Sequence, residues 1–214
     1  MSVAFVFQGG GSLAAVQVGM LQALTRAGIR PDLVVGSSAG AVNAVRFAMS
    51  PSSSGVARLV RAWREVQRGD LIPTRAWNLI GGLSGFRDGV ASNVKLGQFL
   101  EREIGNVNLD QTRIPAYVVA TDLASGDPIT LSVGSAVPAL LATTALPGLF
   151  APVEIDGRLL IDGGVTADTP ILQAEILGST ETYVLSAIGP VAPEAVPQGA
   201  IPVALRALTQ LLGR

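Results

Sequence analysis

The first quarter of this 214-residue chain contains one local arrangement twice, and this repetition constrains the fold more than any other feature. An apolar run, residues 3–7, is followed by the glycine-rich stretch QGGGS and then by apolar residues at helical spacing from Leu13 to Leu24. A second run, residues 32–36, is followed by small residues that suit a helix over residues 39–49. Short apolar runs are typical of strands buried on both faces, so the two units predict a parallel α/β sheet.

The rest of the chain extends this pattern. Two antiparallel hairpins are predicted, one across TDLASGD (residues 121–127) and one across Asp156-Gly157. Helical spacing is expected over residues 56–68, 93–104, 135–143, 170–177 and 202–212, and a strand over residues 182–187. Residues 71–89 are predicted to form a loop or flap, and the proline-rich segment 189–202 an extended connection. Nothing suggests a second domain, so we expect one three-layer α/β/α domain over residues 1–214 with a mainly parallel central sheet.

Composition excludes several classes of function. The chain has fifteen basic and sixteen acidic residues and no run of basic residues, which argues against nucleic acid as a partner. The chain has neither cysteine nor histidine, so the common transition-metal ligands are missing, and we expect no metal and no cofactor. We see no signal peptide and no apolar stretch of the ~20 residues that a membrane span needs. We therefore expect a cytoplasmic protein that can meet a membrane or micelle surface peripherally; the oligomeric state is not predicted.

A nucleophile is suggested by VVGSSAGA, which places Ser38 in a G-x-S-x-G frame with Gly36 and Gly40. An apolar run precedes this motif and a helix-like segment follows it. That context is the sharp strand-to-helix turn on which a serine hydroxyl is exposed. A glycine-serine turn without chemistry is the alternative interpretation.

The glycine-rich loop Gly9 to Gly11 lies between a strand and a helix, where backbone N–H groups can converge on a phosphate or on an oxyanion. The stretch from Gly9 to Ala14 also satisfies the dinucleotide pattern G-x-G-x-x-A. A dinucleotide site also requires an acidic residue at the end of the second strand to bind the ribose, and this chain has Gly36 and Ser37 there. A P-loop is also excluded, because no G-K-[ST] follows the glycines. An oxyanion hole is therefore the interpretation that agrees best with Ser38, and a tight turn without chemistry stays an alternative.

The absence of histidine leaves Lys95, Tyr117, Tyr183 or one of the sixteen carboxylates as the base. Asp162 is the strongest candidate, because it directly follows the apolar run RLLI and precedes Gly163 and Gly164. A buried strand would deliver this carboxylate into a glycine-lined opening. Asp122 ends a similar run, but the sequence around it, TDLASGD, is typical of a turn. Without Ser38, Asp162 would likewise be interpreted as a turn or cap carboxylate.

The glycine loop, G-x-S-x-G, ALPGLFAPV and DGRLLIDGG, taken in this order over residues 3–183, resemble the patatin-like phospholipases. This resemblance implies a Ser-Asp dyad that needs no histidine: Ser38 as nucleophile, Asp162 as base, and Gly9, Gly10 and Gly11 as the oxyanion hole. Two departures stand out. Leu13 and Ala14 replace the last two residues of the family's G-G-G-x-[RK]-G, and the chain stops at Arg214, which indicates a truncated chain or a compact member.

The activity that the resemblance implies is hydrolysis of carboxylic esters in phospholipids or related lipids, of the phospholipase A or lysophospholipase type, through an acyl-enzyme. The loop at residues 71–89 is the candidate wall or lid of the acyl site. The alternatives are a non-catalytic lipid-binding protein of the same fold and a Rossmann-type dinucleotide-binding protein.

Overall fold

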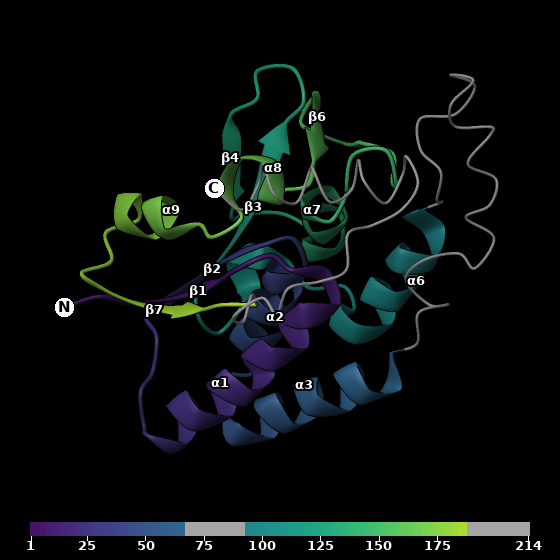
Figure 1. Ribbon diagram of the computed structural model, residues 1–214. Coiled ribbons are helices and arrows are strands. Elements are labelled where there is room, and N and C mark those ends of the chain that lie inside the picture. Colours follow the sequence, from purple (N-terminus) through teal and green to yellow (C-terminus); the bar gives the residue numbers. More distant parts are fainter. Residues whose placement is uncertain (67–92, 188–214) are drawn as a thin grey trace, which may run out of the picture.

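A computed structural model of the chain describes residues 1–66 and 93–187 (Figure 1). The predictions for residues 71–89, for the proline-rich segment and for the helix at residues 202–212 lie outside this part. Among the described residues, no helix is both long enough and apolar enough to cross a membrane.

Within the described residues, a seven-stranded sheet forms the centre, in the order β5-β6-β3-β2-β1-β7 with β4 beside β3. β1, β2, β3 and β7 run parallel, while β3 pairs antiparallel with β4 and β6, and β5 pairs antiparallel with β6. The strands are β1 (Val3–Phe7), β2 (Leu33–Ser37), β3 (Ala116–Asp122), β4 (Pro128–Leu131), β5 (Val153–Ile155), β6 (Arg158–Ile161) and β7 (Glu181–Leu185). The predicted mainly parallel sheet is confirmed.

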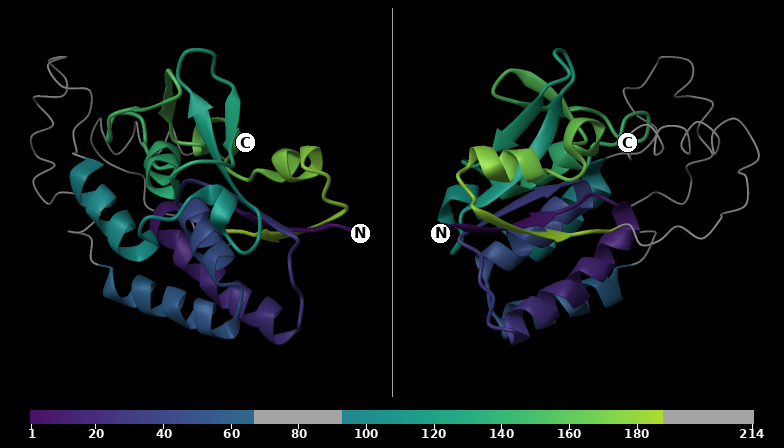
Figure 2. Two further views of the ribbon diagram at one scale, coloured as in Figure 1. Left: turned by 180° about the vertical axis from the view of Figure 1, so that it is seen from behind. Right: turned by 60° about the vertical axis from the view of Figure 1, so that its left-hand side comes forward.

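Helices flank this sheet on both faces, as Figure 2 shows in side view. Larger helices cover one face and the short α8 and α9 the other. The helical segments are η1 (Gly11–Ala14), α1 (Ala15–Arg26), α2 (Ser38–Met49), α3 (Ser53–Glu65), α6 (Asn93–Ile104), η3 (Leu109–Gln111), α7 (Ala136–Thr143), α8 (Gly164–Ala167) and α9 (Ile171–Ile176). The expected α/β/α layering is therefore present.

The core explains why β1 and β2 read as unbroken apolar runs. Phe5, Phe7 and Val34 belong to the large buried cluster under the helical layer that includes α2 and α7. Val6 and Val35, which point to the opposite face, pack in a second cluster with Ala174 of α9. Both faces of these strands are thus shielded from water, and neither face can carry polar residues without loss of stability.

Both predicted hairpins are present, as β3-β4 and β5-β6. The turn between β5 and β6 contains Asp156 at φ 51° and Gly157 at φ 75°. Two successive positive φ values are typical of the type I′ turn, which Asp-Gly favours. This hairpin carries β6 back to β3, and the chain then leaves β6 at Asp162.

Candidate active site

Ser38 lies where β2 ends and α2 begins, with φ at 51°, a value that only a few per cent of non-glycine residues adopt. Such a strained strand-to-helix turn is the geometry that G-x-S-x-G predicts. Gly36 and Gly40 make the turn possible. A Cβ on Gly36 would lie 2.5 Å from Ala41 Cα, and one on Gly40 would lie 2.6 Å from Phe7 O. Any side chain at either position would push α2 away from the sheet.

Asp162 comes directly after β6, and the structure brings it to Ser38 across 124 residues of sequence. Ser38 Oγ donates to Asp162 Oδ2 at 2.8 Å, and the Gly164 N–H donates to Oδ1 at 2.7 Å. Gly163 is tightly packed, because a Cβ there would overlap Val119 O and lie 2.7 Å from Ser37 Oγ. The two glycines after Asp162 therefore let the chain turn closely beside the carboxylate.

Asp162 is buried, with 4% of the residue exposed. Burial raises its pKa to about 6, while the hydrogen bonds from Gly164 and Ser38 oppose this shift and the nearby Asp168 adds to it. At neutral pH the group is mostly ionised, yet it is a stronger base than an ordinary carboxylate. A buried carboxylate in contact with a strained serine is suited to accept the serine's proton.

The end of α7 holds both residues in place, a feature that the sequence did not reveal. Thr143 Oγ1 accepts the Ser38 N–H at 2.8 Å and donates to Val119 O. Two carbonyl groups of the same segment accept the N–H groups of the base region: Ala145 O binds Asp162 N at 3.0 Å, and Thr143 O binds Gly163 N at 3.2 Å. Ser38 and Asp162 are thus both attached to residues 143–145, which lie within the stretch TTALPG.

The glycine loop lies against Ser38, since a Cβ on Gly9 would be 3.3 Å from Ser38 Cβ. Gly9 donates its N–H to Asp168 O at 2.9 Å. Gly10 and Gly11 adopt φ values of 156° and 55°. Within residues 1–66 and 93–187, no hydrogen bond between backbone groups takes up the N–H of Gly10 or of Gly11. Of the three donors expected from the sequence, the Gly9 N–H is therefore engaged by Asp168 O, whereas the Gly10 and Gly11 N–H groups have no backbone partner among the described residues.

Asp168 is a second carboxylate near the dyad, and sequence reasoning missed it. It follows α8 and accepts a hydrogen bond from Gln8 Nε2 at 2.9 Å. Burial raises its pKa, and the bond from Gln8 opposes this effect. A short spacing such as D-x₅-D after a buried strand was the available signal, but nothing in it distinguishes Asp168 from a solvated turn residue.

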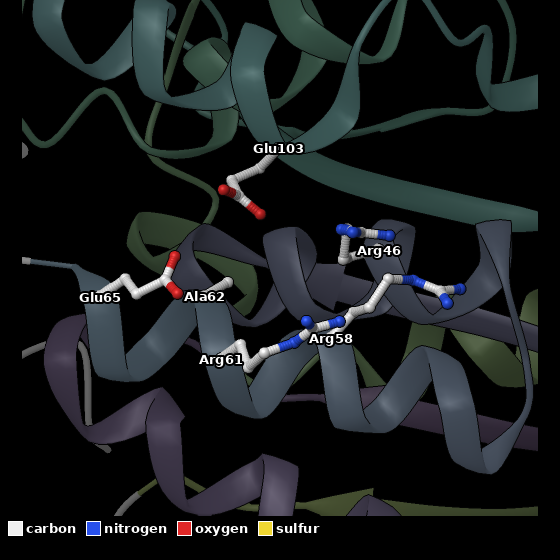
Figure 3. Close-up of a pocket in the computed structure, with 6 residues that line it drawn as sticks. All are labelled: Arg46, Arg58, Arg61, Ala62, Glu65 and Glu103. Atoms are coloured by element: carbon white, nitrogen blue, oxygen red, sulfur yellow. The ribbon is translucent and has the colours of Figure 1, made fainter.

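A separate pocket lies between α2, α3 and α6, away from these residues (Figure 3). Its lining is mostly charged and consists of Arg46, Arg58, Arg61, Ala62, Glu65 and Glu103. Neither Ser38 nor Asp162 contributes to it, so we do not associate it with the dyad. In the described part of the chain, no group of three carboxylates is placed to hold a metal ion.

The remaining candidate bases have other surroundings. Among the described residues, Ser38 forms hydrogen bonds with Asp162 and Thr143. Lys95 is exposed on α6, Tyr117 packs in the second core cluster, and the ring of Tyr183 meets Phe5 edge-on at 5.7 Å.

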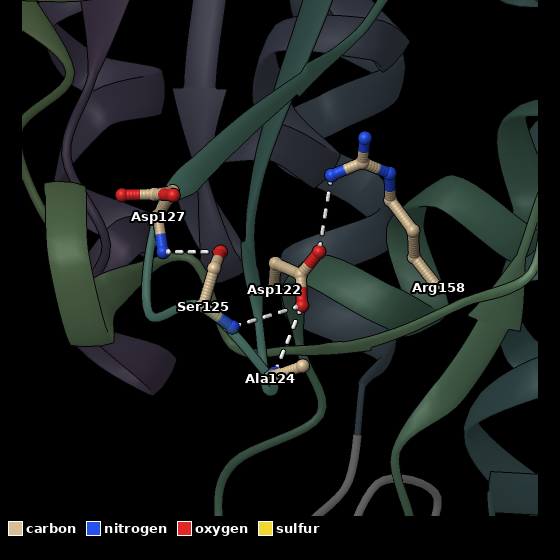
Figure 4. A network of polar contacts seen from close by, with 5 residues as sticks. All are labelled: Asp122, Ala124, Ser125, Asp127 and Arg158. Atoms are coloured by element: carbon tan, nitrogen blue, oxygen red, sulfur yellow. Dashed lines mark hydrogen bonds and ion pairs between the residues drawn. The ribbon is translucent and has the colours of Figure 1, made fainter.

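Asp122 is a turn carboxylate, as its sequence surroundings indicate (Figure 4). It accepts hydrogen bonds from Ala124 N and Ser125 N and pairs with Arg158 at 3.1 Å. The hydrogen bond from Ala124 N does most to hold the pKa of Asp122 below its ordinary value, and the bonds from Ser125 N and Arg158 lower this pKa further. Asp122 therefore stabilises the start of the β3-β4 turn.

Comparison with known proteins places these features in context. The family model described as Patatin-like phospholipase matches residues 5–175. An NTE family protein of Mycobacterium bovis is 30% identical over 169 residues, which are 79% of this chain and 44% of that protein. A patatin-like phospholipase domain-containing protein of Caenorhabditis elegans is 27% identical over 87% of this chain and 16% of its own length.

The neuropathy target esterase sws of Drosophila persimilis is 26% identical over 79% of this chain and 12% of its own length. The chain thus spans less than half the length of each of these relatives. Among solved structures, VipD from Legionella pneumophila superposes with a TM-score of 0.52 at 14% identity, covering 76% of this chain and 45% of VipD. At that identity the likeness concerns the fold alone.

Proposed function

Because the chain belongs to the patatin-like phospholipase family, we propose that it is a serine esterase that hydrolyses carboxylic esters of lipids through Ser38 and Asp162. The observation that carries this proposal is the hydrogen bond of 2.8 Å from Ser38 Oγ to Asp162 Oδ2. In a chain without histidine, this contact supplies the nucleophile with a base.

In the first step, Ser38 Oγ attacks the ester carbonyl while its proton moves to Asp162 Oδ2. The carbonyl oxygen becomes an oxyanion, and the N–H groups of Gly10 and Gly11 are the proposed donors to it. Removing one such donor typically raises the barrier by about 3–4 kcal/mol. Asp162 then gives the proton to the leaving alkoxide, and an acyl-enzyme on Ser38 is formed.

In the second step, water attacks the acyl carbonyl and Asp162 accepts a proton from it. The same donors stabilise the second oxyanion, and Ser38 regains its hydrogen as the fatty acid leaves. Alkoxides leave more readily than amines without a strong acid, so this mechanism favours esters over amides. The raised pKa of Asp162, about 6, places the base near neutral pH, where proton transfer in either direction is efficient.

Lipid as the substrate class is supported by exposed apolar residues beside the glycine loop. Leu13 and Val16 are each 55% exposed, within or just after η1. Their apolar side chains offer a surface on which an acyl chain can lose its contact with water. Phospholipase A or lysophospholipase activity is the finer assignment that we propose.

The test is hydrolysis of a short p-nitrophenyl ester and labelling by a fluorophosphonate, with the labelled residue identified by mass spectrometry. Ser38→Ala and Asp162→Asn should each lower kcat/KM at least ~10³-fold while circular dichroism stays unchanged. Matched controls are Ser54→Ala and Asp127→Asn, which change exposed residues and should leave turnover intact. If the unaltered protein neither hydrolyses esters nor takes up the label, the lipid-binding alternative replaces the esterase.

A further inference from the structure

The side chain of Gln8 connects three segments of the chain at the start of the glycine loop. Gln8 directly follows β1, and its Nε2 donates to Asp168 Oδ2 at 2.9 Å. Its Oε1 accepts from Ser186 Oγ at 2.6 Å and from Ala187 N at 3.1 Å, just beyond β7. Both polar atoms of this amide are therefore engaged in fixing the residue that directly precedes the glycine loop.

Asp168 also holds Gly9, the first residue of the glycine loop. Its backbone carbonyl accepts the Gly9 N–H at 2.9 Å, while its carboxylate binds Gln8. We call these two contacts, with the side chains of Gln8 and Asp168, the Gln8–Asp168 latch. The two contacts oppose any sliding of the loop relative to residue 168.

The latch is also connected to the base. Asp162 is followed by Gly163 and by the short helix α8, and Asp168 comes immediately after this helix. Ala167 N donates to Gly163 O at 2.8 Å, which fixes the turn between the two aspartates. Oxygens of Asp162 and Asp168 approach the same glycine, because a Cβ on Gly164 would lie 3.0 Å from Asp162 Oδ1 and 3.3 Å from Asp168 Oδ1.

A glycine loop has little intrinsic rigidity, so its geometry must be imposed from outside. Oxyanion donors act only within a narrow distance of about 2.7–3.1 Å, and a displacement of about 1 Å can lower the rate ~100-fold. Gln17 supports the loop from the helix side, since its Nε2 donates to Gln8 O at 2.6 Å. The latch supports it from the side of the base.

We infer that Gln8 and Asp168 are positioning residues whose hydrogen bond holds the Gly10 and Gly11 N–H groups in register with Ser38, an inference that rests on the proposed esterase function. Neither side chain takes part in bond making. The pair acts through the backbone of the glycine loop, and its effect belongs to kcat, because the oxyanion exists only along the reaction path.

The test is a reversal of the hydrogen bond. Gln8→Glu sets carboxylate against carboxylate, whereas Gln8→Glu with Asp168→Asn restores a donor on the opposite side and leaves the acceptor for Ser186 and Ala187 in place. Asp168→Asn alone keeps an acceptor for Gln8. Assays at pH 8.5 prevent the two carboxyl groups of the first variant from sharing a proton.

We expect Gln8→Glu to lower kcat ~10–100-fold with KM changed less than ~3-fold, and the double variant to return within ~3-fold of the unaltered protein. Asp168→Asn should stay near the starting value. A double variant as slow as Gln8→Glu, or a Gln8→Glu protein with unchanged kcat, would overturn the inference.

Amide hydrogen exchange at Gly9 gives a readout that does not depend on turnover. Its N–H should exchange at least ~10-fold faster in Gln8→Glu and return toward the original rate in the double variant. Unchanged exchange in Gln8→Glu would contradict the latch. If instead the unaltered protein shows no Ser38-dependent hydrolysis, the esterase proposal fails, and the exchange rates still decide whether the latch holds the loop.

Discussion

At the scale of single residues, opposing effects determine the pKa of Asp162. Burial favours its neutral form, whereas the hydrogen bonds from Gly164 and Ser38 favour its carboxylate. Because burial dominates, the pKa is raised from 3.8 to about 6. The proposed mechanism requires the carboxylate, so the fraction of competent protein falls as pH drops through this value.

The acid side of the activity profile should report this titration. We expect kcat/KM for a p-nitrophenyl ester to fall below an apparent pKa near 6 and to approach a tenfold decrease per pH unit. A profile measured from pH 4.5 to 8.5 checks this expectation, with product detected at its isosbestic wavelength. A limb near pH 4 would mean that an ordinary exposed carboxylate is the base.

The same pKa carries a consequence for stability. A carboxyl whose pKa is higher in the folded than in the unfolded chain stabilises the fold while it is protonated, and this contribution is lost as pH rises through the folded value. Asp162→Asn has no such titration. Relative to the unaltered protein, its free energy of unfolding should therefore increase by about 2 kcal/mol between pH 4.5 and pH 8. Urea unfolding at both pH values measures this difference; a difference that shrinks with rising pH would contradict it.

Thr143 offers a matched pair of substitutions, because its hydroxyl both accepts the Ser38 N–H and donates to Val119 O. Thr143→Val preserves shape but removes the acceptor of the Ser38 N–H and one donor to Val119 O. A buried N–H left without a partner costs about 1–3 kcal/mol. We expect kcat to fall ~10–100-fold in this variant and to stay within ~3-fold in Thr143→Ser. Thr144→Val is the control, since that hydroxyl binds Leu140 O. Equal activity in the Val and Ser variants at residue 143 would remove Thr143 from the list of positioning residues.

At the scale of elements, the packing of α2 against β1 determines how far Ser38 lies from the glycine loop. Gly40 in the first turn of α2 faces the carbonyl groups of Phe7 and Gln8, and a Cβ would overlap the latter. The glycine loop begins at the same place, so the distance between α2 and β1 also sets the distance between Ser38 and the loop. The last glycine of G-x-S-x-G, Gly40, thus serves helix-sheet contact rather than chemistry.

Two glycine-to-alanine substitutions separate this contact from helix propensity. Gly40→Ala should destabilise the protein by at least about 2 kcal/mol and abolish measurable turnover, because α2 must move away from β1. Gly19→Ala on the exposed face of α1, where a Cβ meets nothing within 4 Å, should stabilise the protein by about 0.5–1 kcal/mol. Thermal unfolding of both variants is the measurement. A Gly40→Ala protein as stable as the unaltered one would show that α2 does not need the close approach.

Periodicity made most of these elements predictable. The apolar runs at β1 and β2, the Asp-Gly turn before β6 and the helical spacing in α1 are local properties of the sequence. α8 escaped prediction because Gly164, Val165, Thr166 and Ala167 are too few to show a period. Ser38 and Asp162 were predicted from motifs, whereas Thr143 and Asp168 were not, since their importance comes from partners 105 and 160 residues away.

At the scale of the whole molecule, β1 has one neighbour from the start of the chain and one from far along it. β2 pairs with it on one side and β7 on the other, in register from Val3 with Glu181 to Phe7 with Leu185. Gln8 extends this connection through its bonds to Ser186 and Ala187. The site therefore depends on a strand that contains none of its proposed catalytic residues.

Shortened chains test this dependence. A chain that ends after Gly178 keeps Ser38, Asp162 and the glycine loop but lacks β7, whereas one that ends after Ala187 retains it. We expect the shorter chain to lose at least ~10-fold more ester hydrolysis and to unfold at a lower urea concentration, because one edge of β1 becomes unpaired. Circular dichroism and the p-nitrophenyl assay compare the two. Equal behaviour would show that β1 needs only β2.

The position of β1 between an early and a late strand also has a consequence for synthesis on the ribosome. Of the strands that the structure describes, translation produces β1 first and β7 last, so one edge of β1 stays unpaired in the nascent chain until β7 emerges. During that interval the strand is available to chaperones or to other chains. Pairing of β1 with β7 is thus a late event in the folding of the nascent chain, and the proposed hydrolytic site should mature only after β7 has paired with β1.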